Sequence, residues 1–99
     1  MKRLTELYQE IENLKTHNLV CDVKYRLSHV KRANLPYNYF ETITITFPSS
    51  IDKEKILDVK DYIEHAYVKN GGGVEHVCLK SSHMIELCVV KSESTMRLS

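Results

Sequence analysis

The sequence has no long hydrophobic run, no excess of one charge and no common catalytic motif. No apolar stretch approaches the roughly 18 consecutive residues of a membrane-spanning helix, and the charged start at 1–6 predicts no secretory signal. Fourteen basic and thirteen acidic residues leave a formal net charge of +1, which argues against binding driven by bulk charge. GxSxG, P-loop, HExxH and CxxC patterns are absent. We therefore expect no enzymatic activity, no cofactor and no metal.

Cysteine is scarce and odd in number, with Cys21, Cys78 and Cys88. A secreted domain of this size usually needs disulfides, which use cysteines in pairs. The sequence therefore predicts a reducing, cytoplasmic location. A single bridge between Cys78 and Cys88 across two strands is the alternative.

Ninety-nine residues, 42% hydrophobic and 27% charged, allow one folded domain, which we place at 1–92 with a flexible tail at 93–99. Two segments, 4–17 and 51–69, repeat hydrophobic residues at three- and four-residue steps and so predict helices. Asn18 is expected to end the first in the left-handed conformation, and glycines 71–73 end the second. The apolar stripes are Leu4, Leu7, Ile11 and Leu14, and Ile56, Val59, Ile63 and Ala66.

Four further segments alternate polar and apolar residues and so predict strands at 19–29, 42–47, 74–79 and 84–90. In the second, Ile43, Ile45 and Phe47 are expected in the core, with the three threonines between and before them facing solvent. The order α-β-β-α-β-β predicts an α+β two-layer sandwich, in which both helices cover one face of a four-stranded antiparallel sheet.

The last two strands are expected to meet at a tight turn flanked by Lys80 and His83. That turn would place three cross-strand pairs on one face of the hairpin. The pairs are Cys78 with Ile85, His76 with Leu87, and Val74 with Val89.

This register leaves the opposite face of the hairpin strongly apolar and uncovered by helices. An exposed apolar patch of that size marks a site of association. We therefore expect a homodimer or a docking surface for a larger protein. The alternatives are that the tail, with Met96 and Leu98, folds over the patch, or that sheet twist tucks it under a helix. The predicted partner-binding residues are Val77, Leu79, Met84, Cys88 and Val90, interrupted by Glu75 and Glu86.

Four cations follow Asp22 without an intervening acid, and tyrosines come after them. Cations and aromatic rings are what single-stranded nucleic acid needs. Four charges contribute little at physiological salt, so a solvated loop or a polar protein contact is the favoured interpretation. The candidate residues for nucleic acid or a polar partner are Lys24, Arg26, Lys31, Arg32, Tyr37 and Tyr39, with Pro36 in the same loop.

The five histidines form no metal-binding pattern. His76 and Cys78 share a strand face, as zinc ligands can, but the expected neighbours are apolar. We therefore expect His76 to be a core residue. In Glu64-His65 and Glu75-His76 the adjacent side chains point apart, so neither forms an acid–base pair.

Small stand-alone α+β proteins, including those that phages and mobile elements encode, often act as regulators or inhibitors. The sequence as a whole therefore predicts a small intracellular protein that works by protein–protein contact as a regulator, adaptor or inhibitor, and as a dimer. The alternative is a nucleic-acid-binding module that uses the basic loop and the outer face of the sheet.

Overall fold

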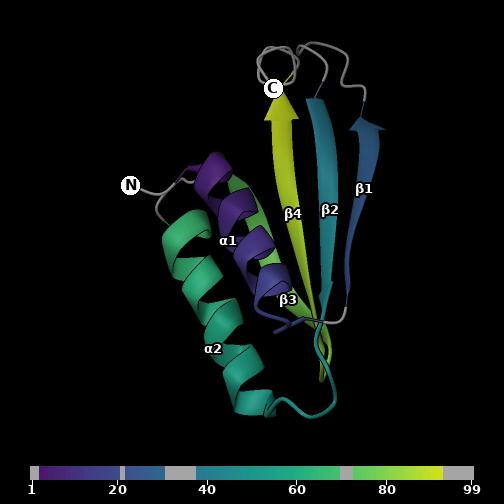
Figure 1. Cartoon of the computed structure of the whole chain (residues 1–99). Helices are drawn as coiled ribbons and strands as arrows, with labels where there is room; N and C mark the ends of the chain where they lie inside the picture. The colour runs from purple at the N-terminus through teal and green to yellow at the C-terminus, as the bar shows by residue number, and fades with distance from the viewer. Residues whose placement is uncertain (1–2, 21, 31–37, 70–72, 93–99) are drawn as a thin grey trace.

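Two helices pack against one face of a four-stranded antiparallel sheet in the computed structural model (Figure 1). The structure describes residues 3–20, 22–30, 38–69 and 73–92. The elements are α1 (Leu4–Thr16), β1 (Asp22–Val30), β2 (Asn38–Thr46), α2 (Lys53–Ile63), the π-helical turn η1 (Glu64–Val68), β3 (Val74–Ser81) and β4 (Met84–Ser92). The predicted α+β class and the order α-β-β-α-β-β are confirmed, and the tail at 93–99 lies outside the described residues.

The helices form where the apolar stripes predict them. α1 buries Leu7 and Ile11, and Asn18 beyond its end has a φ of 57°, so the expected left-handed stop is confirmed. α2 begins at Lys53, two residues later than the sequence suggests, and its last predicted turns are the π-helical η1. Gly73, the described residue of the glycine stop, has a φ of 99° and lies so close to Leu4 that a Cβ there would be 2.7 Å from the leucine side chain.

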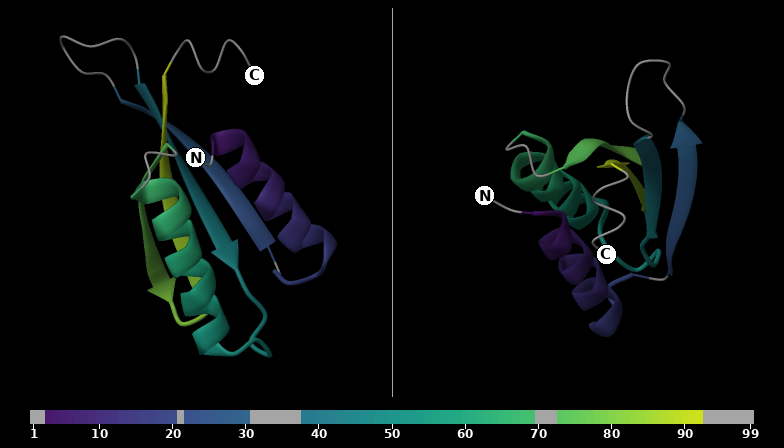
Figure 2. Two further views of the ribbon diagram at one scale, coloured as in Figure 1. Left: turned by 90° about the vertical axis from the view of Figure 1, so that its left-hand side faces the viewer. Right: turned by 90° about the horizontal axis from the view of Figure 1, so that it is seen from above.

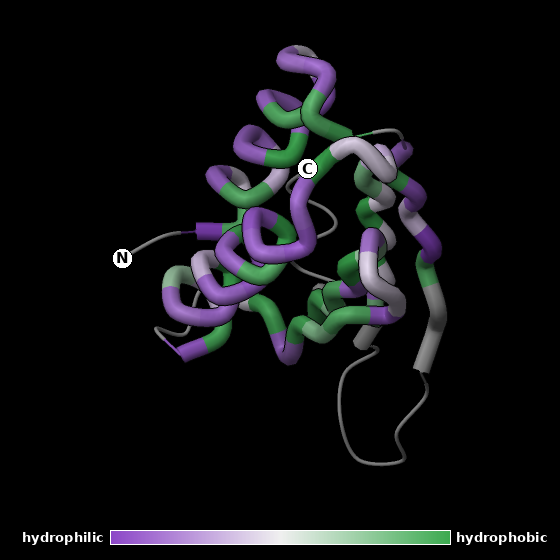
Figure 3. Tube along the Cα trace, turned by 90° about the horizontal axis from the view of Figure 1, so that it is seen from below, coloured by the Kyte–Doolittle hydropathy of each residue, from purple (hydrophilic) through white to green (hydrophobic). Residues whose placement is uncertain are grey.

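The sheet has the strand order β1-β2-β4-β3, so β2 and β4 are central and the other two are edges. The alternation along β2 puts Ile43 and Ile45 in the core with no exposed surface, and Phe47 follows with 4% exposed. The three threonines between and before them take the opposite face, as predicted. Along the helices, hydrophobic and hydrophilic stretches alternate within each turn (Figure 3).

The core lies between the sheet and the helices. It is one cluster of side chains from both helices, η1 and the strands β2, β3 and β4. Of the described side chains of β1, only the partly buried Val23 packs against it. Its buried members are Leu7, Ile11, Ile43, Ile45, Phe47, Ile56, Ile63, Tyr67, Val74, Val77, Ile85, Leu87 and Val89.

The predicted register of β3 is wrong over most of its length. The turn comes one residue later, so Ser81 pairs with Met84, and a bulge at Glu75 restores the predicted pairing of Val74 with Val89. Between these points β3 is shifted by one residue, which moves every side chain to the other face. Val77 is thus buried with 8% exposed, and Leu79 is partly buried against the core.

The same shift moves the polar side chains of β3 outward. His76 pairs with Cys88 and Cys78 pairs with Glu86, and both His76 and Cys78 are exposed. The expectation that His76 is a core residue is therefore wrong.

Candidate functional site

The expected apolar patch on the outer face of the last hairpin is largely absent. Val77 and Leu79 lie on the inner side of the sheet, so placing them on an exposed face was wrong. Met84, Cys88 and Val90 take the outer face, where each is only half-buried. Three spaced side chains of this kind do not make the large patch that predicted a docking surface there.

The exposed large hydrophobic residues of the described chain lie instead on the helical side. They are Leu19 (46% exposed), Tyr25 (41%), Leu27 (49%) and Tyr62 (46%). Two of them, Leu19 and Tyr62, line hollows between the helices. The other two are on β1, where the helices leave the inner face of the sheet partly uncovered.

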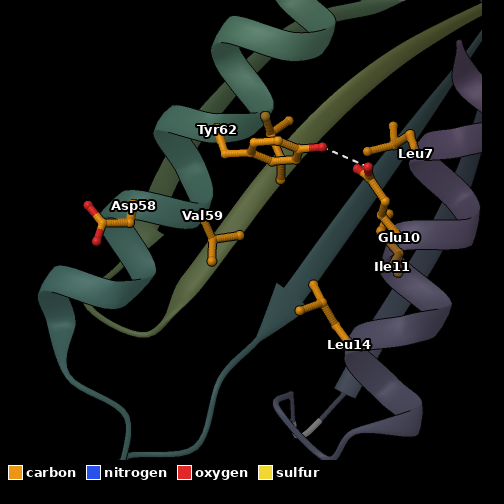
Figure 4. A pocket seen from close by; sticks show the side chains of 8 residues that line it. Leu7, Glu10, Ile11, Leu14, Asp58, Val59 and Tyr62 are labelled. Atoms are coloured by element: carbon orange, nitrogen blue, oxygen red, sulfur yellow. Dashed lines mark hydrogen bonds between the residues drawn. The ribbon is translucent and has the colours of Figure 1, made fainter. Parts of the chain in front are cut away.

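The larger hollow, of about 400 Å³, lies between α1 and α2 (Figure 4). The two helices are closest near the start of α1 and diverge toward the start of α2 (Figure 2). Because they diverge, their apolar stripes face each other without meeting. Leu7, Ile11 and Ile63 are nearly fully buried in its lining, whereas Leu14 and Val59 are half-buried. The remaining lining residues are Glu10, Asp58 and Tyr62.

A second hollow, of about 120 Å³, continues the first toward the start of α2. The two share Leu14 and Val59 and so lie next to each other, and together they are here called the interhelical groove. The lower part is lined by Leu14, Leu19, Phe47, Ile51, Lys55 and Val59.

Two tyrosines close the upper end of the groove by binding one carboxylate. The Tyr62 hydroxyl donates to Oε1 of Glu10 at 2.6 Å, and the Tyr67 hydroxyl donates to Oε2 at 2.7 Å. The two rings meet edge to face with centroids 6.4 Å apart. Burial, and then the bond to Glu10, raise the pKa of the Tyr67 phenol well above its ordinary value. The phenol therefore stays protonated at neutral pH, and this cluster joins α1 to α2 as a structural contact.

A polar hollow of about 320 Å³ lies on the outer face of the sheet. Lys24 and Arg26, two of the sequence-predicted contact residues, line it together with Lys80 from β3. Lys80 bonds to Glu86 at 3.3 Å, while neither Lys24 nor Arg26 makes an ion pair within the described residues. Glu86, Thr42 and Thr44 complete the lining. Lys31, Arg32, Pro36 and Tyr37 lie outside the described residues, as does the side chain of Tyr39.

The described histidines belong to separate elements. His17 and His65 each place Nδ1 within 2.8 Å of a carbonyl oxygen one turn earlier in the same helical segment. His83 bonds to the carbonyl of Ile51 at 3.1 Å and so ties the β3–β4 turn to the start of the α2 segment. No group of three or more potential metal ligands occurs in the part of the chain that the structure describes. Cys78 and Cys88 are free thiols on the outer face.

Sequence reasoning missed the interhelical groove because it treated each apolar stripe as fully buried. The available signal was the width of the stripes. Tyr62 stands beside the second stripe and Leu19 follows the first helix, so the apolar surface of the helical layer extends beyond the residues that the core buries. The divergence of the helices depends on long-range packing and therefore could not be predicted from the sequence.

No family model, curated protein or solved structure matches the chain. No helix of the described residues is long and apolar enough to cross a membrane.

Proposed function

We propose that this protein binds another protein by taking an amphipathic helix of that partner into the interhelical groove. The observation that carries the proposal is the pair of adjacent apolar hollows between α1 and α2, with Leu19 and Tyr62 each 46% exposed at their margins. Amphipathic helices bind in this way by laying side chains at positions i, i+4 and i+7 into an apolar groove.

The length of the groove fits about two turns of helix. Its α2 lining runs from Lys55 to Ile63, about 12 Å at the helical rise of 1.5 Å per residue. A third helix laid between two diverging helices fills the wedge and covers Leu14 and Val59. The apolar surface that it would remove from water is the main source of affinity.

The charge of the helical layer favours a basic partner. α1, α2 and η1 carry seven acidic and four basic residues. At the margin of the groove itself, Asp58 and Lys55 are both exposed, so the acidic excess belongs to the helical layer as a whole. An acceptable partner helix therefore has apolar residues on one face and lysine or arginine beside them.

An NMR titration of the protein with a synthetic helical peptide tests the proposal. The peptide has leucines on one face of the helix and lysines on the other. We expect chemical-shift changes at Leu14, Leu19 and Val59, and at least tenfold weaker binding after Leu19→Ser. Leu27→Ser is the matched control, because Leu27 is equally exposed but lies outside the groove. The same helix with glutamate in place of lysine should bind more weakly.

Two results contradict the proposal. One is binding that Leu19→Ser and Leu27→Ser weaken equally. The other is light scattering that shows a dimer abolished by Leu19→Ser, because a second copy of the chain then fills the groove. The dimer expected from the sequence remains a prediction that this measurement also addresses.

Single-stranded nucleic acid is the second candidate, favoured by the polar hollow with Lys24, Arg26 and Lys80. Support is weaker, because Lys80 is already paired with Glu86 and two remaining cations give little affinity at physiological salt. A gel shift with single-stranded RNA at low salt, lost after Lys31→Glu/Arg32→Glu and steeply salt-dependent, would support it. No shift would remove it.

A further inference from the structure

The two edge strands of the sheet differ in how they are protected against another strand. β3 has two register irregularities, between Val74 and His76 and between Leu79 and Ser81, and α2 and η1 pack against it. Bulges and covering helices are standard protection for a sheet edge. β1 pairs with β2 over nine consecutive residues without any irregularity. No described strand pairs with its other edge, so alternate backbone groups there are free to bond.

The helical layer also leaves the inner face of β1 partly uncovered. α1 reaches β1 through Tyr8, whose ring centroid lies 6.2 Å from that of Tyr25. The Tyr8 hydroxyl donates to Glu41 on β2, which fixes the ring in place. Tyr25 remains 41% exposed and Leu27 49% exposed. A strand added beside β1 would place its own inward side chains against these two residues.

The outward side chains of β1 select the kind of strand that can be added. Lys24 and Arg26 are exposed, and their cross-strand neighbours on β2 are the neutral Thr44 and Thr42. Asp22, which is also exposed, lies on the same face at the start of the strand. If two copies paired antiparallel through β1 about Tyr25, Lys24 of each would oppose Arg26 of the other. Like charges opposite each other destabilise a strand pair, so a second copy is disfavoured in this register, which uses the middle of the strand.

We propose that β1 binds an extended acidic segment of another protein as a fifth strand. The segment alternates aspartate or glutamate, facing Lys24 and Arg26, with apolar residues that cover Tyr25 and Leu27. Main-chain hydrogen bonds supply affinity and the alternating side chains supply selectivity. This site is separate from the interhelical groove and does not depend on it.

A blocked heptapeptide of alternating glutamate and valine is the probe, with its lysine–valine counterpart as control. We expect the acidic peptide to shift the backbone amides of residues 22–30 and to slow their hydrogen exchange. The lysine peptide should bind about tenfold more weakly, because the lysines opposite Lys24 and Arg26 replace two attractive pairs with two like-charge pairs.

Variants separate this site from the groove. Lys24→Glu/Arg26→Glu should weaken the acidic peptide about tenfold and favour the lysine peptide. Lys80→Glu is the matched control, since Lys80 lies on the same sheet face at the opposite edge. Leu27→Ser should weaken the peptide and Leu19→Ser should not. These results would support the fifth strand whether or not a helix binds the groove.

Several results would overturn the inference. One is an acidic peptide that leaves the amides of β1 unchanged, and another is binding that is indifferent to the double charge reversal. A third is a dimer that forms through β1 without peptide. The last is single-stranded RNA that binds β1 more tightly than the acidic peptide does, with binding abolished by Lys24→Glu/Arg26→Glu. That result would mean that Lys24 and Arg26 bind nucleic acid.

Discussion

The inner and outer faces of the sheet are built from the same strands, yet their side chains differ in burial. A shift of a strand by one residue therefore moves each of its side chains from one environment to the other. On the inner face, Ile45, Ile85 and Leu87 are fully buried under the helices. On the outer face, Thr44 and Cys88 are half-buried by their strand neighbours alone. Because adjacent residues alternate between these environments, a single bulge decides whether an apolar side chain stabilises the core or is offered to a partner.

The largest expected effect tests this contrast at two adjacent positions of β3. Val77→Asn puts an amide into the core without a partner and loses apolar packing, so we expect a loss of about 3 kcal/mol in the free energy of unfolding. Cys78→Asn changes an outward side chain and should cost less than about 0.5 kcal/mol. Urea denaturation of both variants measures the difference. Equal losses would contradict the observed register of β3.

A smaller effect concerns the tyrosine pair that joins the helices. Tyr67→Phe removes a bond to the Glu10 carboxylate from a fully buried ring, and we expect a cost of about 1–2 kcal/mol. Tyr62→Phe removes the other bond to Glu10 at a ring that is 46% exposed, where water replaces it, and should cost less than about 1 kcal/mol. Thermal or urea unfolding at pH 7 compares them. The reverse order would mean that the exposed ring carries the contact.

The raised pKa of Tyr67 adds a pH dependence with a defined sign. The unfolded chain loses this proton near pH 10, whereas the folded protein keeps it, so stability falls as the pH rises above about 10. At pH 10.5 the loss from one such tyrosine is about 0.8 kcal/mol. Tyr67→Phe should remove that part of the alkaline loss. An alkaline slope that is unchanged in this variant would place the effect elsewhere.

The smallest effect is kinetic and compares the two thiols of the outer face. Burial, and then Glu75 and Glu86, raise the pKa of the Cys88 thiol. Cys88 is also less exposed than Cys78. We expect iodoacetamide to modify Cys78 first at pH 7.5, because Cys78 is the more exposed thiol and the raised pKa of Cys88 lowers the amount of its reactive thiolate. Mass spectrometry of the digested protein follows both sites, with Cys78→Ser isolating the slower one. Faster modification of Cys88 would contradict its position.

The two proposed binding surfaces both include exposed apolar side chains on the inner, helix-covered side of the sheet. The interhelical groove and the margin of β1 both exist because two helices cover one sheet face incompletely. The groove variants and the β1 variants described above are therefore expected to change binding with little change in stability. Leu19→Ser or Leu27→Ser causing a large loss of stability would mean that these leucines are core residues.

The sequence predicted the parts of the fold that local repeats control. Leu7 and Ile11 follow the helical period, Ile43 and Ile45 follow the strand period, and Asn18 takes the left-handed stop. These outcomes depend on backbone geometry within a few residues, which is the same in any fold. The inward face of β4, with Ile85, Leu87 and Val89, was predicted for the same reason.

The candidate site was not predictable in this way. The sequence of a strand does not show which of its two faces packs against the core until the pairing with its neighbour is known. The bulge at Glu75 depends on the pairing of β3 with β4 and on the packing of β3 under α2. For this reason the prediction that Val77 and Leu79 lie on the exposed face of the sheet was wrong.

The chain by itself determined which residues form helices and strands, because those periods arise from the backbone of each segment. Only the tertiary structure decided the tilt of α1 against α2, the register of β3 and the open edge of β1. Each of these is a compromise among contacts distant in the sequence, and together they determine which apolar side chains stay in contact with water.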